Sequence, residues 1–196
     1  MLHLEERLRM GDEIMKTYIY EGGFGIVAKS GVGSAIKHQK NMLKQADIEE
    51  AKSWKEADIV HINTVFPDSV LAACLAKMQG KKVVYYGHST MEDFRNSFIG
   101  SNRLGDIVIT PTEYSKGLLK SYGIQKKIYA VSNGVDTEFF QSRNKEKEKL
   151  ELHEKYKIPM NRKVVVSAGH LIQRKGILDF LKLAKMMPET TFIWFG

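Results

Sequence analysis

The chain has 196 residues, of which 43% are hydrophobic and 27% charged, and its net charge is +7. These values are typical of globular proteins and argue against disorder. A single cysteine excludes a disulfide framework and a cysteine-based zinc site. The longest apolar run, Val70–Ala76, is far too short to span a membrane, and the charged stretch MLHLEERLRMGDEI lacks the apolar core of a signal peptide. We therefore expect a cytoplasmic chain, with a peripheral membrane role left open.

From Thr17 onward, short apolar runs alternate with helical patterns. The expected strands are Thr17–Glu21, Asp58–Asn63, Lys82–Tyr86, Asp106–Thr110, Lys127–Val131, Lys163–Ala168 and Thr191–Phe195. The expected helices are Ser34–Gln45, Asp68–Met78, Glu113–Tyr122, Lys145–Tyr156 and Ile177–Met187. Near-continuous apolar strands are typical of parallel sheets covered on both faces. The alternation predicts an α/β protein with a doubly wound parallel sheet.

Four segments are expected along the chain. Residues 1–14 are either an extension ahead of a natural start at Met15 or a short helix, and residues 15–140 form the first domain. Residues 141–160 are expected to form a charged linker helix, and residues 161–196 the start of a second domain that is not completed. Because its parallel strands would expose their edges, we expect this last segment to be mobile or to mediate self-association.

The positive charge is concentrated near the end of the chain. Residues 141–196 contain 12 Lys and Arg against 6 Asp and Glu, whereas residues 1–140 contain 18 and 17. The densest run, Arg143–Lys157, mixes both signs at helical spacing, which is typical of a solvated helix face. A nucleic-acid surface needs a basic face with interleaved aromatic residues. No nucleic-acid partner is therefore expected.

Two glycine-bearing segments are candidate phosphate sites. Gly31 and Gly33 open a helix, where backbone amides and the helix N-terminus favour an anion, although a plain tight turn explains them equally well. Ile36 stands where a dinucleotide fingerprint needs its third glycine. In GHLIQRKG, Arg174 and Lys175 lie beside a glycine-bearing loop and suit a diphosphate, with a basic surface turn as the alternative.

Polar residues also stand where expected strands end. His61 and Asn63 follow one strand, and His88 follows another. The C-terminal ends of parallel strands face the ligand crevice of such folds, so His88 could bind a sugar or move a proton there. The six histidines show no metal-binding spacing, and no metal or cofactor is expected.

Taken together, these residues resemble the retaining glycosyltransferases of family 4, which have the GT-B fold. The resemblance lies in SGVGSAIKHQ, DIVHINTVFPDS, GHSTMEDFRNSF, ITPTEYSK, NGVDTEFF and AGHLIQRKG, and it covers nearly everything from Met15 onward. Within the family, the chain most resembles bacterial enzymes that glucosylate diacylglycerol. The resemblance implies two Rossmann-like domains, with the acceptor on the first and a nucleotide sugar on the second.

The resemblance also implies roles for individual residues. His88 matches the histidine near the transferred sugar, Gly31 the loop glycine at the donor phosphate, and Lys175 the lysine on the diphosphate. Gly33 and Arg174 are further donor-side candidates, and the acceptor-side candidates are His61, Asn63 and Asp68. The implied partners are UDP-glucose and a lipid acceptor at the inner face of the cell membrane.

The sequence departs from the family pattern at three places. His170 stands where the family usually has arginine, the acidic pair that holds the donor sugar would lie beyond Gly196, and the stretch between Phe98 and Asp106 is short. We therefore expect the chain alone to be inactive in transfer. Two alternatives stay open: a noncatalytic acceptor-binding or remnant domain, and an epimerase-like enzyme of the same fold.

Overall fold

The computed structural model describes residues 9–10, 13–23, 30–88, 99–141 and 144–196. It divides the chain into two compact units, residues 1–134 and 135–196, and each is considered by itself. The division falls at Gly134, ahead of the boundary expected after Phe140. Residues 89–98, which carry most of the GHSTMEDFRNSF motif, lie outside the described residues.

Unit 1 is built on a five-stranded parallel sheet in the order β3-β4-β5-β6-β7. The strands are β3 (Thr17–Tyr20), β4 (Ile59–Ile62), β5 (Lys82–Tyr86), β6 (Ile107–Thr110) and β7 (Lys127–Ala130). An isolated parallel bridge joins Thr17 to Glu50, so the chain after the first helix passes the edge of β3 before it returns to form β4. The expected parallel sheet is thus confirmed.

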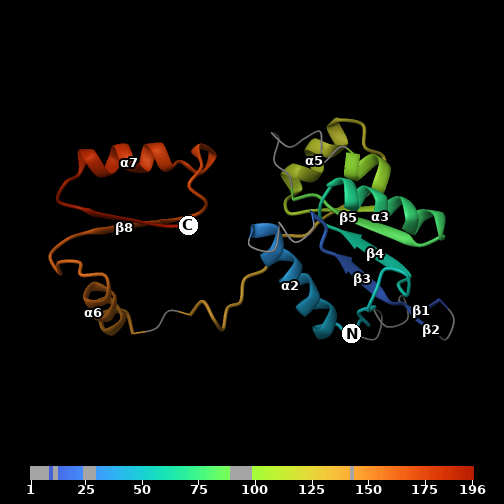
Figure 1. Ribbon diagram of the computed structural model, residues 1–196, viewed down its shortest axis with the longest axis horizontal. Coiled ribbons are helices and arrows are strands. Elements are labelled where there is room, and N and C mark those ends of the chain that lie inside the picture. Colours follow the sequence, from blue (N-terminus) through green and yellow to red (C-terminus); the bar gives the residue numbers. More distant parts are fainter. Residues whose placement is uncertain (1–8, 11–12, 24–29, 89–98, 142–143) are drawn as a thin grey trace. The chain divides into compact units, whose positions relative to one another are not determined.

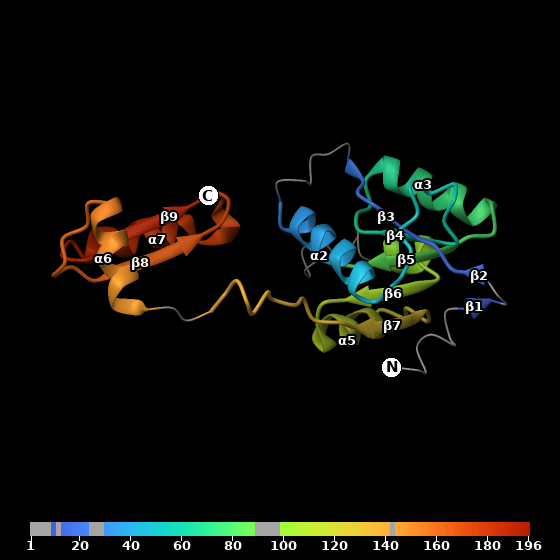
Figure 2. The same cartoon turned by 90° about the horizontal axis from the view of Figure 1, so that it is seen from below.

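Helices cover both faces of this sheet (Figure 1). On one face lies α2 (Gly31–Gln45), whose Ile36 packs against Ile19 of β3. On the other face lie α3 (Pro67–Met78), the π-helix η4 (Gly100–Leu104) and α5 (Glu113–Ser121), which form the main core with the strands. The doubly wound arrangement follows from this division, and Figure 2 shows the same sheet from below.

Alternation along the strands decides which side chains reach each face. Val60 and Ile62 of β4 and Val83 and Tyr85 of β5 are fully or almost fully buried in the main core. Their neighbours in sequence point the opposite way, because successive side chains in a strand alternate. His61 and Tyr86 therefore lie on the α2 face of the sheet.

Capping residues set the helix starts. The Ser30 hydroxyl accepts a hydrogen bond from the Gly33 amide, so α2 begins at Gly31, three residues before the expected start. The Thr112 hydroxyl likewise accepts from the Ser115 amide and begins α5, as expected. Such caps satisfy amides that have no partner within the helix.

Near the N-terminus, β1 (Arg9–Met10) and β2 (Glu13–Ile14) form a short antiparallel pair. The alternative of a helix is therefore wrong for these four residues. The sequence patterns also did not indicate η4, nor the 3-10 turn η5 (Gln173–Lys175) in unit 2.

Unit 2 contains α6 (Lys145–Lys155) followed by the strand–helix–strand pattern expected from the sequence. Its strands β8 (Val164–Ala168) and β9 (Thr191–Phe195) are parallel, and α7 (Ile177–Met186) connects them. Phe180 of α7 makes edge contacts with the rings of Phe192 and Trp194. These three aromatic side chains hold the helix on the strands.

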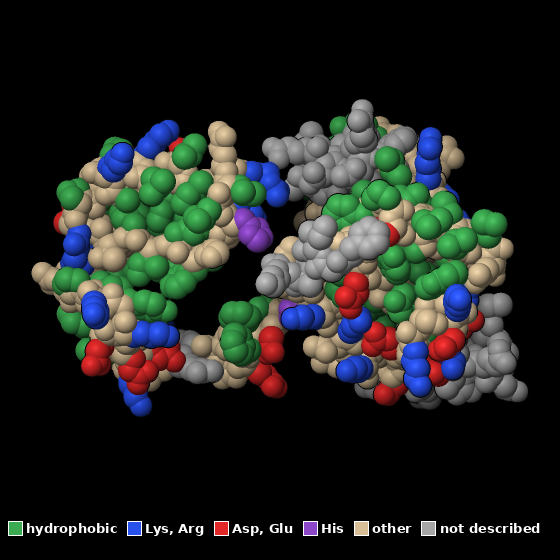
Figure 3. Space-filling model, viewed as in Figure 1, with side chains coloured by type: hydrophobic (Ala, Val, Ile, Leu, Met, Phe, Trp, Pro, Cys, Tyr) green, Lys and Arg blue, Asp and Glu red, His purple; other side chains and the backbone are tan. Residues whose placement is uncertain are grey.

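Much of the apolar surface of unit 2 is exposed, and Figure 3 shows hydrophobic side chains gathered on it. Both Val165 and Val166, which are neighbours in β8 and point to opposite faces, are exposed, as is Leu181 of α7. No residue of α7 is buried. Unit 2 is therefore much less well packed than unit 1.

Candidate functional site

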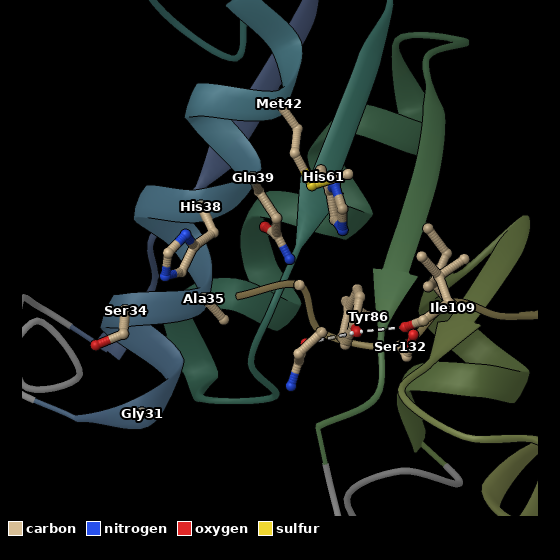
Figure 4. Close-up of a pocket in the computed structure, with 13 residues that line it drawn as sticks. Gly31, Ser34, Ala35, His38, Gln39, Met42, His61, Tyr86, Ile109 and Ser132 are labelled. Atoms are coloured by element: carbon tan, nitrogen blue, oxygen red, sulfur yellow. Dashed lines mark hydrogen bonds between the residues drawn. The ribbon is translucent and has the colours of Figure 1, made fainter. Parts of the chain in front are cut away.

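A cleft of about 250 Å³ opens on the α2 face of the unit 1 sheet, toward the C-terminal ends of its strands (Figure 4). Its walls come from α2, from β4, β5 and β6, and from the segment after β7. The lining residues are Gly31, Ser34, Ala35, His38, Gln39, Met42, His61, Tyr86, Ile109, Val131, Ser132, Asn133 and Gly134. Among these described residues there is no Asp, Glu, Lys or Arg.

One edge of α2 forms a wall of the cleft. The residues Ser34, Ala35, His38, Gln39 and Met42 recur at helical spacing and line it. A neighbouring stripe of the helix packs on β3 through Val32, Ile36 and Leu43. The packing of this stripe fixes which side chains face the cleft.

Three aromatic rings lie in a row beside the cleft. The ring centroids of His61 and Tyr86 are 6.2 Å apart, and those of Tyr86 and His88 are 4.3 Å apart, each pair inclined by 26°. The Tyr86 hydroxyl donates to the Val131 carbonyl at 3.0 Å and lies 3.1 Å from the Asn133 side-chain oxygen. These contacts tie the end of β5 to the segment that follows β7.

A pair of amides fixes the orientation of His88. Asn63 and Gln39 exchange two hydrogen bonds of 2.9 Å, and the Asn63 oxygen also lies 2.9 Å from Nε2 of His88. Because an amide oxygen can only accept, this contact places a proton on Nε2. Asn63 is buried, and its side chain is engaged by Gln39 and His88, so its geometry suits the positioning of His88 better than contact with an acceptor.

Burial keeps both histidines of this row neutral at pH 7. Burial, together with a smaller effect of the nearby His88, lowers the pKa of His61 to about 4. Burial likewise lowers the pKa of His88 to about 4 and raises the pKa of Tyr86. Nε2 of His61 is buried, and it has no hydrogen-bond partner in the described part of the chain.

Asp68, expected on the acceptor side, does not line the cleft. Its Oδ2 accepts from the Gly23 amide at 2.7 Å and from the Tyr20 hydroxyl at 3.3 Å. Gly22 and Gly23 both have a positive φ of 65°, a conformation that favours glycine. The carboxylate therefore holds the turn that leaves β3.

The donor-side candidates are divided between the two units. Gly31, the first residue of α2, is exposed and lines the cleft, whereas Gly33 is buried. Arg174 and Lys175 lie in η5 of unit 2, and both side chains are exposed. Lys175 lies near Gly169, where an added Cβ would be 3.6 Å from the lysine side chain.

The structure brings His61, Asn63 and His88 together, as their positions at strand ends predict. It places His61 in the cleft lining, whereas His88 stacks behind Tyr86. Sequence reasoning missed Tyr86 and Gln39. The position of Tyr86 at the end of β5 was a usable signal, whereas Gln39 depends on the rotation of α2.

The described residues contain no cluster of three or more His, Cys, Asp or Glu that could hold a metal ion. Nor is any helix among them long and apolar enough to cross a membrane.

Comparison with known proteins identifies the family. Residues 33–139, more than half of the chain, match the profile of Glycosyltransferase Family 4. The chain belongs to glycosyltransferase family 4.

Two curated relatives add detail. Over 93% of its length, the chain is 35% identical to the processive diacylglycerol alpha-glucosyltransferase of Acholeplasma laidlawii and covers 58% of that protein. It is 27% identical over 87% of its length to the alpha-galactosylglucosyldiacylglycerol synthase of Streptococcus pneumoniae and covers 50% of it. The chain therefore spans about half the length of these relatives.

A solved glycosyltransferase from Rickettsia africae resembles the fold, with a TM-score of 0.51 and 16% identity. The similarity covers 95% of this chain and 69% of that structure. It supports the Rossmann-like architecture of this family 4 member.

Proposed function

We propose that this chain is the acceptor-binding part of a retaining hexosyltransferase that moves glucose from UDP-glucose to a lipid such as diacylglycerol. The observation that carries the proposal is a cleft at the C-terminal ends of a Rossmann-like sheet, with no Asp, Glu, Lys or Arg among its described lining residues, in a chain 35% identical to a diacylglycerol glucosyltransferase. Pockets at this edge of open α/β sheets commonly bind ligands. Such a protein would work at the inner face of the cell membrane, where its lipid acceptor lies.

In the proposed reaction, the bond between glucose and the diphosphate breaks while the acceptor oxygen bonds to the same face of the sugar, and the proton of the acceptor hydroxyl passes to an oxygen of the leaving diphosphate. Negative charge then develops on the leaving diphosphate. Arg174 and Lys175 of unit 2 would stabilise it, and one well-placed donor is worth roughly 3 kcal/mol in such sites. Within unit 1, the backbone amides near Gly31 are candidates for the same role. His88 would orient the sugar through its ring, which Asn63 and Tyr86 hold in place.

A transfer assay tests the proposal. The chain is incubated with UDP-[14C]glucose and vesicles containing diacylglycerol, alone and fused to the part of the A. laidlawii relative that the match leaves uncovered. We expect the fusion, and not the chain alone, to form an α-linked glucosyl-diacylglycerol. His88→Ala in the fusion should lower the rate at least about tenfold.

The second candidate is a noncatalytic acceptor-binding domain, which the absence of Asp, Glu, Lys and Arg from the described lining of the cleft favours. If this candidate is right, the fusion should fold and bind both UDP-glucose and diacylglycerol, but it should not transfer glucose. If that folded fusion neither binds diacylglycerol nor transfers glucose, both candidates are wrong.

A further inference from the structure

We infer that the cleft of unit 1 binds the glycerol-ester part of an uncharged lipid, with Nε2 of His61 hydrogen-bonded to a hydroxyl or ester oxygen of the ligand. That the lipid is a diacylglycerol rests on the proposed function, whereas the preference for an uncharged ligand rests on the cleft itself. The inference therefore distinguishes diacylglycerol from phosphatidic acid, which differ by one phosphate.

The side chains that line the cleft favour a ligand without a charge. The cleft is lined mostly by apolar and polar groups, and its described residues include no Asp, Glu, Lys or Arg; its two titratable bases are the histidines His38 and His61. A phosphate moved into such surroundings loses its hydration without gaining a counter-charge, which is costly. The N-terminus of α2 beside Gly31 supplies partial positive charge, but this effect is confined to the first turn of the helix. Met42 lies about three turns further along α2, so the end of the cleft beside Met42 gains no such charge.

The lining of the cleft also includes a ring with a buried nitrogen that has no hydrogen-bond partner among the described residues. A buried polar atom without a partner is unfavourable, and such atoms are rare in native proteins. Nε2 of His61 is such an atom, on a ring that lines the cleft. Because burial lowers the pKa of His61 to about 4, its ring is neutral at pH 7 and suits an uncharged oxygen.

Access to this nitrogen requires a small movement, and Met42 can provide it. Gln39, Met42 and His61 lie toward the same end of the cleft (Figure 4). Met42 is 56% exposed, and its unbranched side chain can change rotamer without disturbing the core. We expect the ligand to displace this side chain and to satisfy the nitrogen.

The size of the cleft limits what it can enclose. A volume of about 250 Å³ is below the 300–1,000 Å³ typical of pockets that bury a whole drug-sized ligand. The cleft can hold a glycerol ester and its first methylene groups, whereas long acyl chains would extend beyond it. A lipid bound in this way could keep its chains in a membrane.

The test is a binding titration of the complete chain labelled with [15N]histidine, monitored by two-bond 1H–15N NMR spectra. The probes are dihexanoylglycerol, its methyl ether at the hydroxyl, and dihexanoyl phosphatidic acid. Dihexanoylglycerol should shift the ring nitrogens of His61, and phosphatidic acid should bind at least about tenfold more weakly. A shift that the ether retains assigns the contact to the ester oxygen, and a shift that it loses assigns it to the hydroxyl.

Two variants test whether the nitrogen of His61 contributes to binding. His61→Leu keeps apolar volume but removes the nitrogen, and should weaken binding of dihexanoylglycerol about tenfold, as expected for one hydrogen bond. The matched control Tyr129→Leu replaces an exposed ring of β7 outside the cleft lining and should change binding less than twofold. If His61→Leu does not fold, the titration of the unmodified chain still decides.

Equal binding of phosphatidic acid, or no shift of His61 with dihexanoylglycerol, would overturn the inference. The latter result would leave an ordered water as the partner of Nε2. Because binding is read without glucose transfer, a fusion that transfers glucose while these titrations fail contradicts the inference alone. Titrations that succeed with a folded but inactive fusion contradict the proposed transferase alone.

Discussion

At the scale of single residues, the two neutral histidines make the stability of unit 1 depend on pH. The pKa of each ring is lowered from 6.5 to about 4, so an unfolded chain binds more protons than the folded one between these values. The free energy of unfolding should therefore fall as the pH falls from 6.5 to 4, by up to about 1.4 kcal/mol per pH unit for each histidine. Urea unfolding at several pH values measures this slope.

The variant His61→Leu isolates one of the two contributions. It removes one buried ionisable ring and should reduce the slope between pH 6.5 and 4 to roughly half, because His88 still titrates. A slope that His61→Leu leaves unchanged would show that the imidazole of His61 is not held neutral by the fold.

The contact between Asn63 and His88 gives a second prediction at this scale. Asn63→Asp places a carboxylate 2.9 Å from Nε2 of His88, and a negative charge at that distance favours the protonated ring. We expect the pKa of His88 to rise well above 4, as measured by NMR titration. The control Gln39→Leu leaves the Asn63 oxygen on His88 and should keep the pKa of His88 low.

At the scale of elements, apolar periodicity was sufficient to predict the helices and strands of the sheet. Strands such as IVHI and KVVYY end within a residue of their expected bounds, because burial on both faces requires continuous apolar residues. Helix α2 begins three residues before the start expected from apolar periodicity, because the hydroxyl of Ser30 caps it. The π-helix η4 has only five residues, too few to show a repeating pattern of apolar side chains, so the sequence could not predict it.

Some residues of the cleft could be predicted from the sequence, because they follow directly after predicted strands. Strand ends indicated His61, Asn63 and His88, because parallel strands bring their C-terminal ends to one edge. Their mutual contacts depend on how α2 is rotated over the sheet, which long-range packing on Ile19 decides. Gln39 and Met42 therefore reach the cleft through tertiary structure rather than through a local motif.

The packing of η4 against β5 gives a prediction at the scale of elements. A Cβ added at Gly100 would overlap the ring of Tyr85, which is only 2% exposed. Gly100→Ala should therefore lower the free energy of unfolding by about 1–3 kcal/mol, the usual cost of overpacking. The matched control is Gly117→Ala in α5, where the added methyl group meets nothing within 4 Å.

Helix propensity alone should make the Gly117 variant neutral or more stable by up to about 1 kcal/mol. Urea titration of both variants, monitored by circular dichroism, gives the comparison. If the two variants were equally stable, the close approach of η4 to Tyr85 would be refuted.

At the scale of the whole molecule, the two units differ in the completeness of their cores. Unit 1 buries its central strands between helices on both faces, whereas unit 2 has only two strands in its sheet, and the helix α7 that connects them has no buried residue. Small units bury a smaller fraction of their surface and are correspondingly less stable. We infer that the units unfold as separate cooperative steps, with unit 2 unfolding first.

The two tryptophans make this inference testable, because each unit contains one. Trp54 packs against the main core of unit 1, and Trp194 contacts Phe180 and donates to the Gly169 carbonyl at 2.6 Å in unit 2. In urea, the fluorescence of Trp54→Phe should therefore report unit 2, and that of Trp194→Phe should report unit 1. We expect the midpoint for unit 2 to be lower by at least about 1 M, since a difference of 1–3 kcal/mol shifts a midpoint by that amount. Coincident midpoints in the two variants would instead show that the two units unfold in one cooperative step.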